Sequence, residues 1–219
     1  ILAISSTYTI QYSDQIHKII RSTFNLLGYR EIDLNSKNNK NKGSKPIVIL
    51  GYYRVAQAFI QEIVQTHHHM KDQILVVDFS PVAKQSLDHM GIECIYGDIS
   101  NPGALHHAGV ENAQLIISST SDTFLKGTTN LKLVQVLREL CPNSRLIMTA
   151  ENENQARVLY HEGAHYVLQP FKMVGSSLIP TVLTGLNGNL NMMREQDLEN
   201  IENDFLKREL YLKKGRTEK

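Results

Sequence analysis

The chain has 219 residues, of which 42% are hydrophobic and 21% are charged, and its formal net charge at pH 7 is +1. This length and composition predict a globular protein with one sizeable core and some appended segments. The near-zero charge excludes functions that need a strong electric field, so we expect no nucleic acid partner.

The first 45 residues are expected to precede the globular domain. Ile1–Ile10 is apolar and begins without methionine, which favours an internal stretch of a longer polypeptide. Ser13–Leu27 carries apolar residues at helical spacing and predicts an amphipathic linker helix. Asn35–Lys45 is a polar run that predicts a flexible linker, so we place a domain boundary near Pro46. No stretch of the chain approaches the roughly 20 apolar residues of a transmembrane helix.

The next segment has the pattern strand, tight turn, helix, strand. Ile47–Leu50 and Ile74–Val77 are continuous apolar runs, as expected of strands buried on both faces. Tyr52–Thr66 places its apolar residues on one face at helical spacing. Gly51 lies at the turn and Asp78 ends the second strand, which is the opening unit of a dinucleotide-binding fold.

The glycines of that fold are only partly present. The pattern G-x-G-x-x-G/A falls on Gly51, Tyr53 and Ala56. Gly51 permits the turn and Ala56 lets the helix lie close to the sheet, but Tyr53 stands where bare backbone would approach the phosphates. The sequence therefore supports the fold more than it supports pyrophosphate binding.

Strands and helices continue to alternate along the chain. The further predicted elements are helices at Pro81–Met90, Pro102–Ala108, Thr123–Leu140 and Asn154–Glu162, and strands at Ile92–Tyr96, Leu115–Ser118, Arg145–Ala150 and Tyr166–Leu168. This rhythm predicts an α/β fold with a Rossmann-like, doubly wound, parallel sheet of six strands. The two cysteines, Cys94 and Cys141, lie in or beside apolar segments without a C-x-x-C pair, so we expect buried thiols.

A helical extension follows Pro170. Met173–Leu186 has a wide apolar face that either caps the sheet or forms a dimer contact. Asn187–Asn189 ends this helix, so the nucleotide-binding domain is expected to span residues 46–188. Asn191–Lys219 is charged with a thin apolar stripe, which fits a surface or partner-bound helix as well as a solvated tail.

Several polar residues have both a functional and a plainer explanation. Asp78 is either a ribose ligand or a solvated acid at a strand end. Asp98 is a ligand or part of a Gly-Asp turn. Arg54 lies in the first helical turn, where a nearby anion would justify a cation, although a surface arginine explains it too. Asn130 is a ligand contact at the sheet edge or a structural hydrogen-bonding group. His67–His69 is expected to be a solvated loop, because three adjacent residues do not converge on one metal ion.

Five motifs occur in an order that resembles the RCK domain, also called the TrkA-N or KTN domain. They are Leu50–Ala56, Val77–Phe79, Tyr96–Ile99, Leu125–Leu131 and Glu162–Pro170. More narrowly, the chain looks like the cytosolic domain that follows the membrane part of Kef-type monovalent cation:proton antiporters. The resemblance covers about residues 47–186, and the segment before it resembles the end of a last membrane helix and a linker helix.

This resemblance implies a regulatory domain rather than an enzyme. Such domains pair as homodimers, bind AMP, ADP, ATP or NAD(H) at the carboxyl edge of the sheet, and bias the membrane antiporter domain of the same polypeptide between active and inactive states. The chain would then be the cytoplasmic domain of a bacterial inner membrane protein that transports potassium or sodium. Because Tyr53 departs from the family glycine, a mononucleotide, or no nucleotide at all, is favoured over a full dinucleotide.

The resemblance also assigns roles to particular residues. Gly51 and the helix start at Arg54 and Val55 would face the phosphates, and Asp78 the ribose. The remaining expected nucleotide-binding residues are Tyr53, Phe79, Gly97, Asp98, Ile99, Ser118, Ser119 and Thr120. No catalytic or metal-binding residue is expected.

Two alternative functions remain open at this point. One is an NAD(P)-dependent oxidoreductase, which is opposed by the lack of a Tyr-x-x-x-Lys motif or paired His/Asp constellation after the fold begins. The other is a degenerate domain that keeps the fold only for dimerisation.

Overall fold

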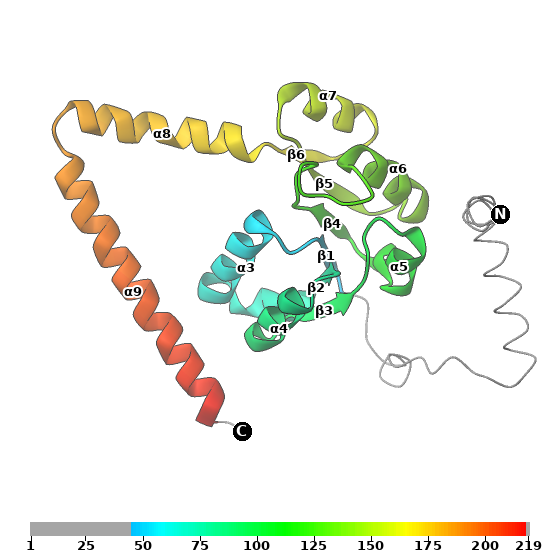
Figure 1. Ribbon diagram of the computed structural model, residues 1–219, viewed down its shortest axis with the longest axis horizontal. Helices are drawn as coiled ribbons and strands as arrows, with labels where there is room; N and C mark the ends of the chain where they lie inside the picture. Colours follow the sequence, from blue (N-terminus) through cyan, green and yellow to red (C-terminus); the bar gives the residue numbers. More distant parts are fainter. Residues whose placement is uncertain (1–44, 218–219) are drawn as a thin grey trace, which may run out of the picture. The chain divides into compact units, whose positions relative to one another are not determined.

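The computed structural model of the chain describes residues 45–217, and the helix and linkers expected before residue 45 lie outside this range. Six parallel strands form one sheet in the order β3-β2-β1-β4-β5-β6 (Figure 1). The strands are β1 (Ile47–Leu50), β2 (Ile74–Asp78), β3 (Glu93–Tyr96), β4 (Leu115–Ser118), β5 (Arg145–Thr149) and β6 (Tyr166–Leu168). The predicted Rossmann-like fold is therefore confirmed.

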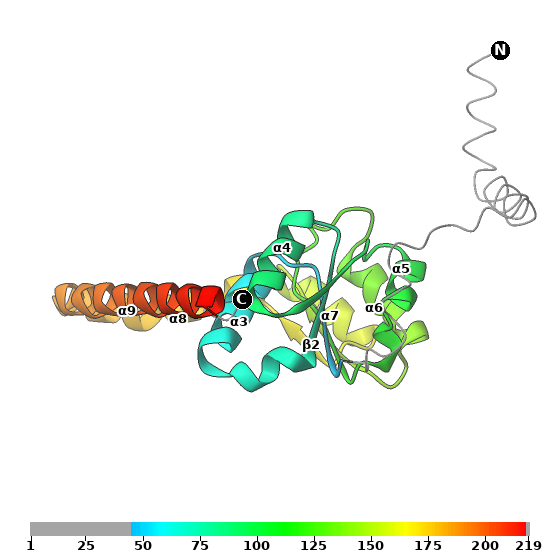
Figure 2. The same cartoon turned by 90° about the horizontal axis from the view of Figure 1, so that it is seen from below.

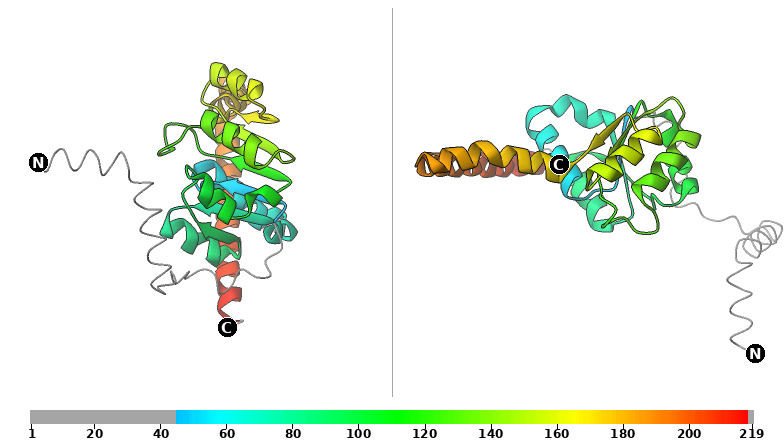
Figure 3. Two further views of the ribbon diagram at one scale, coloured as in Figure 1. Left: turned by 90° about the vertical axis from the view of Figure 1, so that its right-hand side faces the viewer. Right: turned by 90° about the horizontal axis from the view of Figure 1, so that it is seen from above.

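Helices cover both faces of the sheet. They are α3 (Arg54–Thr66), α4 (Pro81–Met90), α5 (Pro102–His107), α6 (Asn130–Leu140) and α7 (Glu153–His161), with 3-10 turns η1 (His68–Gln73) and η2 (Val110–Asn112). Figure 2 shows α3 and α4 on one side of β2, and α5 and α6 on the other, and the views of Figure 3 agree. Successive strand residues point to opposite faces, so Ile49 packs with α3 and α4 while Val48 and Leu50 pack with α5, α6 and α7. The buried apolar runs in the sequence are explained by this two-sided core.

Most of these helices begin with a capping side chain. In α4, α5, α6 and α7 the residue before the first turn accepts a hydrogen bond from a backbone N–H of that turn. The caps are Ser80, Asn101, Thr129 and Asn152, in that order. Helix α3 differs, because Tyr53 precedes it without a side-chain cap. Its N-terminal N–H groups are thus left to another acceptor.

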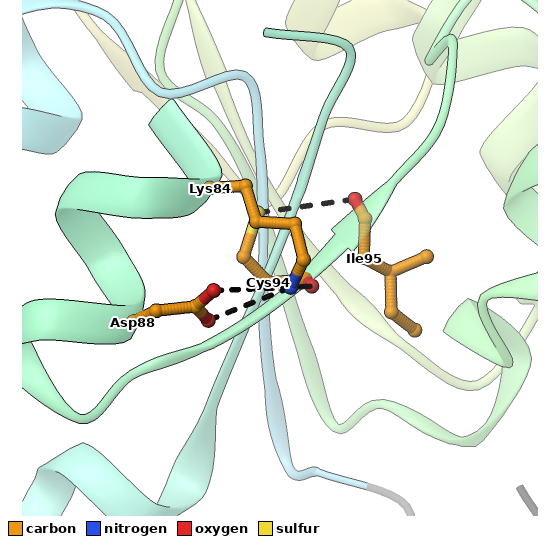
Figure 4. Close-up of polar contacts among 4 residues, drawn as sticks. All are labelled: Lys84, Asp88, Cys94 and Ile95. Carbon is orange, nitrogen blue, oxygen red and sulfur yellow. Dashed lines mark hydrogen bonds and ion pairs between the residues drawn. The ribbon is translucent and has the colours of Figure 1, made fainter. Parts of the chain in front are cut away.

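Helix α4 is tied to the edge strand β3 by Lys84. Its Nζ donates to the backbone carbonyl of Cys94 over 3.1 Å and lies 3.4 Å from the Asp88 carboxylate (Figure 4). Both cysteines are buried free thiols, as predicted, and burial raises the pKa of Cys94 and of Cys141 to about 11. These thiols therefore act as packing groups.

Helix α6 is shorter than the sequence predicts. The helix expected over Thr123–Leu140 begins only at Asn130, and residues 119–129 form a loop between β4 and α6. Gly127 has a φ of +73° there, a left-handed conformation that a helix cannot continue through. Asp122 accepts hydrogen bonds from the backbone N–H and the side-chain amide of Asn130, which fixes where the helix starts. The helix expected from Tyr52 likewise begins at Arg54, after the turn.

The C-terminal part consists of α8 (Pro170–Leu186) and α9 (Leu190–Thr217). Helix α8 starts three residues earlier than predicted because Pro170 is tolerated at the first helical position. None of its residues is buried, and large apolar side chains such as Leu178 and Ile179 are more than half exposed. Gly188, with a φ of +78°, ends the helix within the predicted break. Within residues 45–217, no helix is long and apolar enough to cross a membrane.

Candidate functional site

A cavity of about 710 Å³ opens at the carboxyl edge of the sheet, on the side of β1, β2 and β3. Its volume lies in the range of roughly 300–1,000 Å³ that holds small-molecule ligands. The strand register aligns Leu50 with Val77 and with Ser118, so the segments after β1, β2 and β4 leave the sheet side by side. This edge is where ligands bind in doubly wound folds.

The structure brings together seven of the expected binding residues. Gly51, Tyr53, Asp78, Phe79, Asp98, Ile99 and Thr120 line the cavity. The other five, which are Arg54, Val55, Gly97, Ser118 and Ser119, do not line it. Ten further residues that the sequence reasoning did not select also line it: Tyr52, Gln57, Ser80, Val82, Ala83, Ser86, Tyr96, Phe124, Leu125 and Lys126. Three of the ten come from the loop that was predicted to be helix, so the error in secondary structure concealed them.

The turn after β1 requires glycine. Gly51 has a φ of +83°, and its N–H donates to the carbonyl of Val77 over 2.9 Å. A Cβ at this position would lie 2.6 Å from Oγ1 of Thr120, far inside contact distance. The turn therefore keeps its backbone and the Thr120 hydroxyl closer than any other amino acid allows.

Asp78 is bonded to the backbone rather than solvated. Its Oδ2 accepts from the N–H of Tyr52 over 2.6 Å, and its Oδ1 accepts from the N–H of Ser80 over 2.7 Å. The residue is only 9% exposed. The carboxylate thus holds the β1 turn against the start of α4, while each oxygen keeps a lone pair that a ribose hydroxyl can use.

The segment after β3 has the turn geometry that the Gly-Asp pair suggested. Oδ1 of Asp98 accepts from the N–H of Ser100 over 2.8 Å, and its carbonyl accepts from the N–H of Asn101 over 3.0 Å. Gly97 donates its N–H to the carbonyl of Asp78 over 3.1 Å. Asp98 is exposed whereas Ile99 is buried, so this wall offers one acid and one apolar surface.

The polar residues after β4 are mostly bonded to one another. Ser119 donates to the carbonyl of Gly51 over 3.2 Å, and Ser118 donates to Oδ1 of Asn130 over 2.6 Å. Asn130, 1% exposed, donates in turn to the carbonyl of Thr120 over 2.9 Å, so its role is structural. The hydroxyl of Thr120 is the exception, because it is buried against the cavity and has no hydrogen-bond partner in the described residues.

An aromatic contact lies at the mouth of the turn. The rings of Tyr53 and Phe124 have centroids 4.5 Å apart with 39° between their planes. The Arg54 guanidinium lies 5.7 Å from the centroid of the Tyr53 ring, a cation–π distance. Tyr53 thus packs with protein groups in this structure.

A second, smaller cavity of about 360 Å³ lies at the ends of β4 and β5. Asp122, Asn130 and Thr149 line it together with residues of α7. The residues of the His67–His69 run are exposed beside α3, and the described part of the chain contains no group of three or more potential ligands that could hold a metal ion.

Comparison with known proteins identifies the class of domain. The TrkA-N domain family matches residues 47–170, which is more than half of the chain. The chain therefore belongs to the TrkA-N domain family. This is the family that the five sequence motifs resembled, and the described fold agrees with it. A search of curated protein sequences gives no match.

Several solved structures have the same fold. The TrkA-N domain of the inner membrane protein YbaL from Escherichia coli is 16% identical, with a TM-score of 0.55 over 64% of this chain and 98% of that one. The Kef CTD of Shewanella denitrificans in AMP-bound form is 21% identical, with a TM-score of 0.50 over 75% of this chain and 96% of that one. The GsuK channel bound to NAD is 20% identical, with a TM-score of 0.52 over 80% of this chain and 31% of that one. At these identities the similarity establishes the fold.

Proposed function

We propose that this chain is the nucleotide-binding regulatory domain of a membrane protein that transports a monovalent cation, potassium or sodium. One observation carries the proposal: a permissive backbone turn, an uncapped helix start and an unpaired side-chain hydroxyl converge on the main cavity. These are the glycine turn at Gly51, the uncapped start of α3, and the partnerless hydroxyl of Thr120. A phosphate at this point would accept from the free N–H groups of α3 and from the Thr120 hydroxyl.

The rest of the cavity fits a nucleoside. Asp78 ends the second strand, where an acid accepts from ribose hydroxyls in this fold. Phe79, Val82 and Tyr96 line the cavity with about half or more of their surface exposed, and such surfaces gain free energy when a planar base covers them. The effector is thus AMP, ADP or ATP, with NAD(H) as a further candidate. The AMP-bound Kef domain and the NAD-bound GsuK channel support this range of ligands.

The transporter that we propose is a Kef-type cation:proton antiporter whose membrane domain belongs to the same polypeptide. The nucleotide would bind on the cytoplasmic side and stabilise one arrangement of a homodimer, which then favours one state of the antiporter. A ligand shifts such an equilibrium only through its different affinities for the two states. The domain has no reaction of its own in this proposal.

Calorimetric titration of the purified chain with AMP, ADP, ATP, NAD and NADH tests the nucleotide site. We expect saturable binding of at least one, weakened in Thr120→Val, which removes only the hydroxyl. Thr149→Val is the matched control, because its hydroxyl donates to the Ser118 carbonyl away from the main cavity. Absence of binding to all five would reject the proposal, and turnover of the nicotinamide cofactor with a small alcohol or aldehyde would favour an oxidoreductase.

The homodimer is tested separately through α8. Its exposed apolar side chains need a partner surface, and a second copy of the chain would supply one. Light scattering is expected to show a dimer for the purified chain and a monomer for Ile179→Asp. Ser176→Asp places the same charge on the same helix without removing an apolar group, and should remain dimeric. A monomeric parent chain would reject this part of the proposal.

A further inference from the structure

Two cavities lie at the carboxyl edge of the sheet. The aromatic pair of Tyr53 and Phe124 comes from the segments that follow two neighbouring strands. Tyr53 follows β1, and Phe124 lies in the loop after β4. Strands β1 and β4 are neighbours at the point where the strand order reverses. The first cavity includes Tyr53 and Phe124 in its wall, while the second lies over β4 and β5 and shares no lining residue with the first.

This position matters because of the way a dinucleotide lies on such a sheet. It places one nucleoside on each side of the strand-order reversal, and its pyrophosphate crosses at the glycine turn. Here the crossing point carries the Tyr53 ring in contact with Phe124, at a centroid distance of 4.5 Å. A dinucleotide that extends from the first cavity toward β4 would meet this contact, whereas a mononucleotide held within the first cavity would not have to cross it.

The loop that carries Phe124 contacts three other segments of the chain. Toward α6, Asp122 accepts two hydrogen bonds from Asn130, at 2.7 and 2.9 Å. Toward β5, the hydroxyl of Thr123 donates to Glu151 over 2.6 Å. Farther along, Gly127 approaches Ser100 so closely that a Cβ would lie 3.1 Å from its Oγ. Phe124 therefore follows two residues, Asp122 and Thr123, whose side chains bond to other segments, and its separation from Tyr53 requires work against this anchored loop.

We propose that Tyr53 and Phe124 form a selectivity barrier that restricts the site to an adenine mononucleotide and disfavours dinucleotides. The inference rests on the proposed nucleotide site and adds the class of ligand. The barrier replaces the open backbone of a glycine turn with an aromatic contact, and such contacts contribute favourable free energy beyond the area they bury. That contribution is lost whenever a ligand passes between the rings.

The experiment measures the ratio of the dissociation constants of NAD and AMP by calorimetry, in the parent chain and in three variants. The parent chain is expected to bind AMP more tightly. Phe124→Ala and Tyr53→Gly should each lower the NAD/AMP ratio, by on the order of tenfold when the lost aromatic contact is converted to affinity. Phe79→Ala is the matched control: Phe79 lines the same cavity and is 49% exposed, against 50% for Phe124, but it is not part of the pair. Because Phe79 belongs to the proposed base surface, Phe79→Ala should weaken AMP and NAD alike and leave the NAD/AMP ratio unchanged.

The outcomes separate the barrier from the nucleotide site itself. If the parent chain binds NAD as tightly as AMP, the barrier is refuted and the nucleotide site stands. If Phe124→Ala weakens AMP and NAD equally, the rings are a stacking surface for the base, which also refutes the barrier. If no nucleotide binds the parent chain, the proposed function fails, and the barrier fails with it. Thermal melting of each variant confirms that it is folded at the temperature of the titration.

Discussion

Two regions at the same edge of the sheet differ in how completely their polar groups are paired. Around the end of β5, Thr149 donates to the Ser118 carbonyl and Asn152 caps α7. Around the turn after β1, α3 has no capping side chain and the Thr120 hydroxyl has no partner. Folding alone accounts for the first region. The second keeps buried or terminal polar groups unpaired, which costs stability unless a ligand pairs them.

The largest expected effect on stability concerns Asp78, which is hydrogen-bonded within the protein and also lines the main cavity. Asp78→Ala leaves the N–H groups of Tyr52 and Ser80 without their charged acceptor. Hydrogen bonds to charged groups contribute about 1.5–3 kcal/mol each, so unfolding free energy should fall by about 3–5 kcal/mol. Chemical denaturation of Asp78→Ala and the parent chain measures this difference in unfolding free energy.

Asp98→Ala is the matched control for this substitution. Within the described residues the Asp98 side chain accepts a single backbone hydrogen bond, from Ser100, and the residue is exposed. Its loss should reduce the unfolding free energy by only about 0.5–1 kcal/mol. Equal losses of unfolding free energy in the two variants would mean that the Asp78 hydrogen bonds stabilise the protein no more than the exposed bond of Asp98.

The next effect isolates the close approach of Gly51 to Thr120. Gly51→Ala combines a positive φ with a Cβ 2.6 Å from the Thr120 hydroxyl. Gly91→Ala has a similar φ of +72°, but the atom nearest to its Cβ, Nζ of Lys71, would lie 3.4 Å away. We expect about 1–2 kcal/mol of destabilisation for Gly91→Ala from backbone strain alone. Gly51→Ala should lose more than that, and urea denaturation compares the two; a smaller loss at Gly51 would show that the turn can relax.

The sequence predicted the strands and the Gly51 turn because these depend on local patterns. Apolar runs and a glycine before a helix are visible without knowing which segments meet. Phe124, Leu125 and Lys126 were missed because apolar residues around them continued the helical spacing of α6, while the loop is fixed by contacts that are distant in sequence, such as Thr123 with Glu151. The double use of Asp78 was hidden for the same reason: its partner Tyr52 is 26 residues away.

A smaller effect should have opposite signs in the two regions. Thr120→Val removes a hydroxyl that has no partner, so the unfolding free energy should stay level or rise by up to about 1 kcal/mol. Thr149→Val removes a hydroxyl that donates to the Ser118 carbonyl over 2.7 Å, so the unfolding free energy should fall by about 1 kcal/mol. Thermal melting of both variants without nucleotide tests the contrast. Equal destabilisation would indicate that the Thr120 hydroxyl is already paired, through water, in the free protein.

The smallest effect tests the anchor of the Phe124 loop through pH. Hydrogen bonds from the Thr123 side chain, the Ser121 side chain and the Thr123 backbone lower the pKa of Glu151 below its ordinary value of 4.5. Because the folded-state pKa is lowered, the stabilisation is complete above pH 4.5 and is lost as the pH falls through the lowered pKa. The hydrogen bonds between Thr123 and Glu151 are exposed to solvent, so screening limits the effect to about 0.5 kcal/mol or less. Glu151→Gln should therefore be slightly less stable than the parent chain at pH 7, and this difference should disappear on acidification. Glu139→Gln, which removes the same charge from the exposed surface of α6, should show no such pH-dependent difference; if it does, the effect reflects overall charge, and the loop is held by its other contacts.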